Sequence, residues 1–279
     1  MNPPPRDVHQ IGTVTKYELI KYLRGRRLLA IVLLTVIISA ILLIVPPVVG
    51  SQYPKDPTQF ALHMLGFLGT GSATSASISV PLLSVLSATF FGADAIVSEY
   101  ESKTGYFLFP NPIRKTAIFL GKFLASALVS AGTIGLFYLI AAASVRVVDG
   151  SIPVNMGLSF AYSLVYLFAI LAVAYLFSAI MRSSVYSLIL TFFTFFLILP
   201  IVDAVGSVAK FKPWFSLTFA SLISQYIFQN PYPSDTVVNA SGVSLAAYYP
   251  DVRVSLAVME AYFIVAFVLA LMLARRREM

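Results

Sequence analysis

The chain has 279 residues, of which 58% are hydrophobic and 11% are charged, and its formal net charge is +7. An average soluble domain is about 45–50% apolar and about 25% charged. So few charges cannot cover this much apolar surface in water, which excludes an ordinary soluble enzyme and predicts that most of the chain lies in lipid. With no cysteine and only two histidines, the chain has almost no material for disulfides, thiolate sites or histidine metal clusters.

The N-terminal residues precede the first long apolar run and have a different pattern. Residues 1–12 are predicted to be a flexible tail, and residues 13–27 are predicted to be a helix. At about 100° per residue, Leu19, Ile20 and Leu23 share one face of this helix, and charged residues lie opposite. A basic amphipathic helix beside a membrane span is expected to lie in the cytoplasmic interface. The alternative is a plain cytoplasmic extension of the first span.

Six later stretches are apolar for the roughly 20 residues that a transmembrane helix needs. They lack the alternation of a barrel strand, and every backbone polar group must be bonded within lipid, so helices are preferred. The sequence therefore predicts an all-α membrane protein with a single transmembrane domain over residues 1–279. The predicted spans are residues 28–49, 78–97, 117–145, 160–180, 185–205 and 254–274.

The segment from Trp214 to Phe228 is also apolar, but its roughly 15 residues are too few for an ordinary span. Counting it as a seventh span would place Arg275, Arg276 and Arg277 outside the cell, against the positive-inside rule. We therefore predict an interfacial or re-entrant helical segment before the last span.

The positions of lysine and arginine set the predicted orientation of the spans. With six spans, most of the 19 lysines and arginines fall on the side that holds both termini. Both termini are therefore predicted to be cytoplasmic, in a multi-pass protein of the cell membrane. Because this topology accounts for the basic charge, no nucleic acid is expected as a partner.

A search for chemical motifs finds no Walker A pattern, GxxxxGK[ST], so the chain brings no phosphate-binding loop of its own. Asp94, Asp203 and Glu260 are the acidic residues in or beside the predicted spans. Glu260 is either a polar point on a transport path or a protonated or hydrogen-bonded helix contact. Asp94 and Asp203 lie nearer the ends of their spans and are expected to be solvated.

The loop after the second predicted span carries the most informative pattern. From Val97 to Arg114 it reads VSEYESKTGYFLFPNPIR, and Gly121-Lys122 follows. This pattern resembles the permease signature of the type-2 ABC exporter superfamily, in which two acids, a glycine, a leucine, a proline and a basic residue precede a Gly-Lys pair. The matching residues are Glu99, Glu101, Gly105, Leu108, Pro112 and Arg114.

The resemblance implies a transmembrane permease subunit of an ATP-driven exporter. Such subunits pair as homo- or heterodimers, bind two copies of a cytoplasmic ATP-binding subunit, and form a translocation path by alternating access. ATP and Mg²⁺ would bind to the partner, so this chain is expected to hold no cofactor or metal and not to be an enzyme. The acids of the loop would pair with basic groups of the ATPase. The residues expected at this interface are Glu99, Tyr100, Glu101, Gly105, Leu108, Pro112 and Arg114.

In this superfamily the second and fifth spans usually line the path, and a prokaryotic source is expected. The residues expected on the path are Phe91, Thr191 and Phe195, together with Glu260 from the last span. Two other classes stay open: an ion-coupled secondary carrier, with Glu260 as its proton site, and an integral membrane lipid-modifying enzyme. A co-purifying ATPase subunit would separate the exporter from both.

Overall fold

The computed structural model describes residues 7–48, 56–65, 82–101, 114–240 and 243–276, and within these ranges the chain is mostly helical. The elements are α1 (Asp7–Arg24), α2 (Arg26–Val48), α3 (Pro57–Leu65), α4 (Leu82–Gly92), α5 (Val97–Glu101), α7 (Lys115–Asp149), α8 (Met156–Ile180), α9 (Ser184–Phe193), a π-helix (Thr194–Ile198), α10 (Leu199–Ala209), α11 (Leu217–Ser221), α12 (Ile223–Tyr226), β1 (Thr236–Ala240), β2 (Val243–Ala247) and α13 (Val252–Arg276). The two strands pair as an antiparallel hairpin.

In the described residues, 6 helical stretches are long and apolar enough to cross a membrane. They fall where the six spans were predicted, so the prediction of an all-α membrane protein with six spans is confirmed. The stretches are Arg26–Ile44, Leu82–Glu101, Lys115–Val148, Met156–Ile180, Ser184–Ala209 and Val252–Arg276. The predicted start of the second span, residues 78–81, lies outside the described residues.

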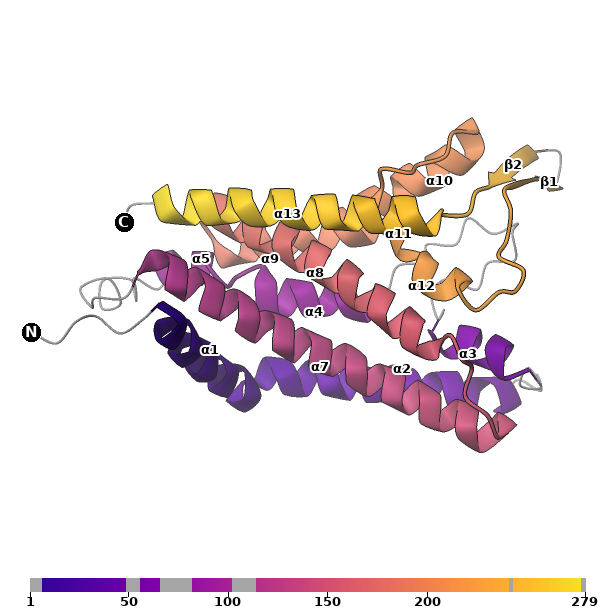
Figure 1. Cartoon of the computed structure of the whole chain (residues 1–279), viewed down its shortest axis with the longest axis horizontal. Helices are drawn as coiled ribbons and strands as arrows, with labels where there is room; N and C mark the ends of the chain where they lie inside the picture. Colours follow the sequence, from indigo (N-terminus) through magenta and orange to yellow (C-terminus); the bar gives the residue numbers. More distant parts are fainter. Residues whose placement is uncertain (1–6, 49–55, 66–81, 102–113, 241–242, 277–279) are drawn as a thin grey trace, which may run out of the picture.

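The long helices form an elongated bundle (Figure 1). The start of α1, the end of α13 and the short helix α5 lie at one end of this bundle. The short helices α3 and α12 and the β-hairpin lie at the opposite end. Both described ends of the chain therefore lie at the same end of the bundle, as an even number of spans requires.

The helix α8 forms the centre of the core. Tyr166, Leu167, Leu171 and Tyr175 are each no more than 1% exposed. This helix packs against α13 and α4. A Cβ atom on Gly92, at the end of α4, would lie 2.8 Å from the Leu171 side chain. The close approach of the second span to α8 therefore requires glycine at this position.

The first helix begins earlier than the sequence suggested. Because α1 covers Asp7–Arg24, the predicted flexible tail over residues 1–12 is wrong from Asp7 onward. The helix expected over residues 13–27 ends before Gly25, which separates α1 from α2.

Packing on α7 explains why α1 starts early. The buried side chain of Gln10 accepts a hydrogen bond from the backbone N–H of Arg114 at 3.3 Å. A Cβ atom on Gly121 of α7 would lie 2.7 Å from Val14, so the two helices are in close contact. The location of α1 in the membrane interface stays a prediction.

The fifth span is a composite of α9, the π-helix and α10. The backbone N–H of Leu199 bonds to the carbonyl of Thr194, five residues earlier, which is the π-helical pattern. Pro200 follows directly, and a proline has no N–H and its ring displaces the carbonyl four residues before it. The proline thus explains why the regular α-helical pattern gives way here.

The segment before the last span is divided between α11 and α12 rather than forming one helix. Leu217, Ala220 and Ile223 are fully buried, and the segment packs against α8, α10 and α13. Trp214, which precedes it, is 59% exposed. The interfacial or re-entrant character of this segment stays a prediction.

Candidate functional site

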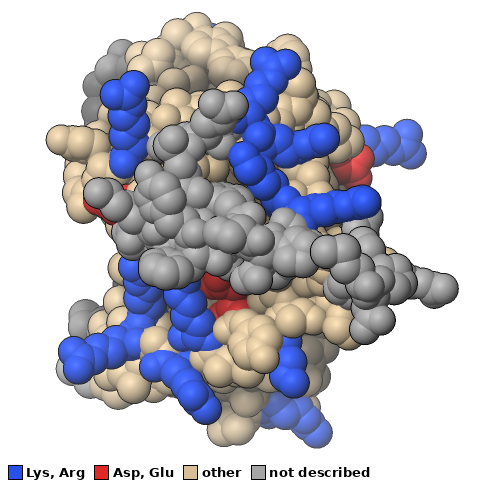
Figure 2. Space-filling model, turned by 90° about the vertical axis from the view of Figure 1, so that its left-hand side faces the viewer, with Lys and Arg blue, Asp and Glu red and all other residues tan. Residues whose placement is uncertain are grey.

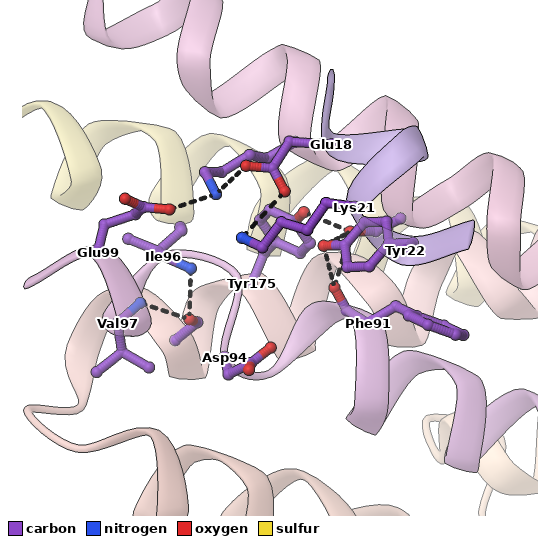
Figure 3. Close-up of polar contacts among 12 residues, drawn as sticks. Glu18, Lys21, Tyr22, Phe91, Asp94, Ile96, Val97, Glu99 and Tyr175 are labelled. Carbon is purple, nitrogen blue, oxygen red and sulfur yellow. Dashed lines mark hydrogen bonds and ion pairs between the residues drawn. The ribbon is translucent and has the colours of Figure 1, made fainter. Parts of the chain in front are cut away.

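The second span is interrupted beside the loop that carries the sequence motif. Between α4 and α5 the chain makes a turn over Ala93–Ile96. The backbone N–H groups of Ile96 and Val97 both donate to the Oγ atom of Ser178 on α8, each at 3.0 Å (Figure 3). A serine hydroxyl can accept two hydrogen bonds, so one side chain satisfies two backbone donors that the interruption leaves unpaired. The break is therefore held firmly against α8.

A buried lysine joins α5 to α1 and α7. The Nζ atom of Lys122 lies 2.6 Å from Glu18 Oε1 and 2.7 Å from Glu99 Oε1, and its side chain is only 5% exposed. In Figure 3, Glu18 and Glu99 point toward each other from α1 and α5. Both carboxylates pair with the Lys122 ammonium. Burying a charge is costly unless it is paired, and here two carboxylates surround one ammonium. We call Glu18, Glu99 and Lys122 the ionic junction.

A second ion pair lies at the turn itself. The carboxylate of Asp94 pairs with the guanidinium of Arg27 at the start of α2. The Asp94 side chain is 8% exposed, so the expectation that Asp94 is solvated is wrong. The reason is the interruption of the span, which turns Asp94 into the bundle where Arg27 can reach it.

Hydroxyl groups form a second set of polar contacts at the end of α4, on the other side of the break. Ser126 Oγ donates to the carbonyl of Phe91 at 2.7 Å and lies 2.8 Å from the Tyr175 hydroxyl. The Tyr22 hydroxyl of α1 also donates to the Phe91 carbonyl, at 3.2 Å. Burial raises the pKa of Tyr22 to about 12, so this hydroxyl is neutral at physiological pH. Side chains from α1 and α7 thus bond to one carbonyl at the end of α4, and Tyr175 of α8 joins them through Ser126.

The two acids of the sequence motif make contacts inside this subunit. Glu99 belongs to the ionic junction, and Glu101 accepts hydrogen bonds from the Ser184 backbone N–H at 2.9 Å and from the Ser183 hydroxyl at 3.3 Å. Glu101 therefore sits at the N-terminus of α9, where a negative charge is favourable. Both acids therefore have partners within the chain. Their pairing with basic groups of an ATPase stays a prediction.

The structure describes two of the other five residues of the predicted interface. Tyr100 is partly buried against the main core, and the side chain of Arg114 is exposed at the N-cap of α7. Gly105, Leu108 and Pro112 lie outside the described residues. The role of these five residues in contacting an ATPase stays a prediction.

The residues predicted to line a path are buried, except for Glu260. Phe91 and Phe195 are buried in separate apolar clusters. Thr191 is buried too, and its hydroxyl donates to the carbonyl of Ser187 at 2.8 Å. Glu260 lies on the exposed face of α13. Their assignment to a translocation path stays a prediction.

Sequence reasoning did not identify the ionic junction, although one signal was present. The sequence pattern used Lys122 as part of the closing Gly-Lys pair and as a cytoplasmic charge, yet this residue lies within the third predicted span. An ionisable side chain inside a span usually faces the bundle interior and has a partner, and this rule points directly to Lys122. Its partners Glu18 and Glu99 are 104 and 23 residues away in sequence, and no local pattern connects them.

These features define a multi-pass helical membrane protein with a buried polar junction next to its motif-bearing loop. Residues 13–279 match the family described as ABC-2 family transporter protein. The chain therefore belongs to this family, which confirms the resemblance seen in the loop, and it is an ABC transporter permease. Proteins of this family are transport subunits that generally work with an ATP-binding subunit. No curated protein matches the chain significantly.

Proposed function

We propose that this permease is the transmembrane subunit of an ATP-driven exporter, and that the loop between the second and third spans receives the movement of a separate ATPase. The observation that supports this proposal is the bonding of α5, the short helix directly before the loop. Its neighbours in the structure are the elements that a transporter would have to move together.

Three contacts of α5 reach three different helices. Glu99 joins it to Lys122 of α7 and, through this lysine, to Glu18 of α1. Glu101 joins it to the N-terminus of α9, and Ser178 joins its first turn to α8. Breaking a buried ion pair costs about 3–5 kcal/mol. A force on the loop would therefore displace these helix ends as a unit rather than detach α5 from them.

The orientation of the permease follows from its charges. Figure 2 shows the end of the bundle where α1 starts and α13 ends, and Lys and Arg side chains surround it. The positive-inside rule favours the cytoplasm for this end, which would place the loop within reach of a cytoplasmic ATPase. Two permeases and two ATPases would form the transporter, with ATP and Mg²⁺ bound by the ATPases. The chain would work in the cell membrane of a prokaryote, by alternating access.

The test uses two exposed arginines at the same end of the bundle. Arg114→Glu changes the loop exit, and a carboxylate at this N-cap position favours helix formation. Arg182→Glu makes the same charge change between α8 and α9 and serves as the control. We expect Arg114→Glu to lose co-purifying ATPase subunit and nucleotide-dependent transport, and Arg182→Glu to keep both. Equal behaviour of the two variants, or ATP hydrolysis by the purified chain alone, would refute the proposal.

A further inference from the structure

A reversal of the chain after α10 brings the next segment back alongside the fifth span. The turn begins at Gly206, whose carbonyl accepts a hydrogen bond from the Phe211 N–H at 3.0 Å. A Cβ atom on Gly206 would lie 2.9 Å from the Phe211 carbonyl oxygen, so the turn requires glycine. Lys210 takes the left-handed conformation, with φ of 57°. The reversal carries α11 back against α10, toward the interior of the bundle.

Asp203 of α10 faces this returning segment. Its Oδ2 atom accepts a hydrogen bond from the Thr218 hydroxyl at 2.5 Å, across 15 residues of sequence. Its Oδ1 atom is buried and has no hydrogen-bond partner among the described residues. The expectation that Asp203 is solvated is therefore wrong, because the reversal of the chain covers its carboxyl group.

A second buried oxygen without a partner lies nearby. Tyr166 of α8 is 1% exposed, and its hydroxyl has no hydrogen-bond partner among the described residues. This hydroxyl interacts electrostatically with Asp203, and Ser221 of the returning segment also faces it. The Ser216 hydroxyl, 2.9 Å from that of Thr218, completes the polar surroundings.

No described basic group balances the charge of an ionised Asp203. The described elements packed against α10 are the π-helix, α11 and β2, and their sequences contain no titratable side chain. Tyr166 is the titratable group that faces it from α8. Beyond the turn, Lys210 is exposed and Lys212 pairs with Asp235 at 2.9 Å.

An unpaired carboxylate in such surroundings is costly, and buried acids without a counter-charge are generally neutral. A proton on Oδ1 would remove the charge and turn an acceptor into a donor. A hard metal cation would instead need about six oxygen ligands, and one carboxylate with a few hydroxyls does not supply them.

We propose that Asp203 is a proton-binding site of this permease, with the Thr218 hydroxyl positioning its protonated carboxyl group. Loss of the proton would leave an unbalanced negative charge between α10 and α11. Proton binding therefore holds the returning segment against the fifth span. The site lies at the end of the bundle remote from α5, so it is independent of the proposed coupling to an ATPase.

Infrared spectroscopy of the purified protein in lipid nanodiscs at neutral pH tests the proposal directly. We expect a carbonyl stretch of a protonated carboxylic acid that shifts on exchange into D₂O. Asp203→Asn should remove this band, whereas Glu260→Gln, which changes the acid on the exposed face of α13, should leave it. Thr218→Val, which removes the hydrogen bond to Oδ2, should shift the band without removing it, and this keeps the test valid if Asp203→Asn does not fold. Absence of the band from the wild type, or its survival in Asp203→Asn, would overturn the proposal.

Thermal unfolding separates a proton from a metal cation. The wild type should lose stability relative to Asp203→Asn as the pH rises, because the asparagine side chain mimics the protonated acid and cannot ionise. Melting temperatures in sodium chloride and in choline chloride should be equal. A stabilisation by sodium that Asp203→Asn abolishes would assign the site to a metal cation and refute proton binding.

Discussion

The ionic junction makes a quantitative prediction for Lys122→Met. This change removes the ammonium and leaves Glu18 and Glu99 facing each other, with side chains only 13% and 16% exposed. Breaking a buried ion pair in this way costs about 3–5 kcal/mol. At about 2–4 °C per kcal/mol for a domain of 150–250 residues, we expect the melting temperature to fall by about 6–20 °C.

Two comparisons test whether buried charge causes this effect. Lys21 also pairs with Glu18, at 3.4 Å, but its side chain is 62% exposed. An exposed pair contributes about 0–1 kcal/mol, so Lys21→Met should melt close to the wild type. Neutralising both acids together with Lys122→Met, as Glu18→Gln and Glu99→Gln, should recover most of the loss.

Unfolding is followed by intrinsic fluorescence during heating of the detergent-purified protein. The reasoning fails if Lys122→Met melts within about 2 °C of the wild type, which is at most about 1 kcal/mol at the same conversion. It also fails if the neutral triple variant melts no higher than Lys122→Met.

Three further predictions concern the broken second span, each measured by thermal unfolding. Ser178→Ala leaves two buried N–H groups unpaired and should destabilise the protein by about 1–3 kcal/mol for each. Ser178→Thr keeps the hydroxyl and should lose less stability, and equal losses would contradict the role of this hydroxyl as an acceptor. Gly92→Ala should lose about 1–3 kcal/mol through its contact with Leu171, whereas Gly132→Ala, where a Cβ meets nothing within 4 Å, should not; the opposite order would contradict the packing. Burial raises the pKa of Tyr22 from 10.0 to about 12, so its contribution to the stability of the protein should be complete below pH 10 and lost as the pH rises through 12. Tyr22→Phe should flatten the dependence of stability on pH in this range, and an unchanged dependence would contradict this role.

The six spans could be predicted because hydrophobicity adds up locally over about 20 residues. The break in the second span could not, since it depends on a hydroxyl 82 residues from Ile96 in sequence. Likewise, the loop motif was sufficient to find the family. It could not show that Glu99 forms an ion pair with Lys122, because α5 approaches α7 only when the helices pack into the bundle. The early start of α1 has the same cause, a contact between Gln10 and Arg114 across 104 residues.

The π-helix has a consequence for the angular phase of the fifth span. Each residue of an α-helix advances by about 100° around the axis, and a π-turn accommodates an additional residue. A single helical wheel drawn from Ser184 to Ala209 would therefore be out of phase beyond Ile198 by about this angle. Without the additional residue, Asp203 would be rotated away from α11 and out of reach of Thr218. The accessibility of successive cysteine substitutions along this span should accordingly show one jump in periodicity, at the π-turn.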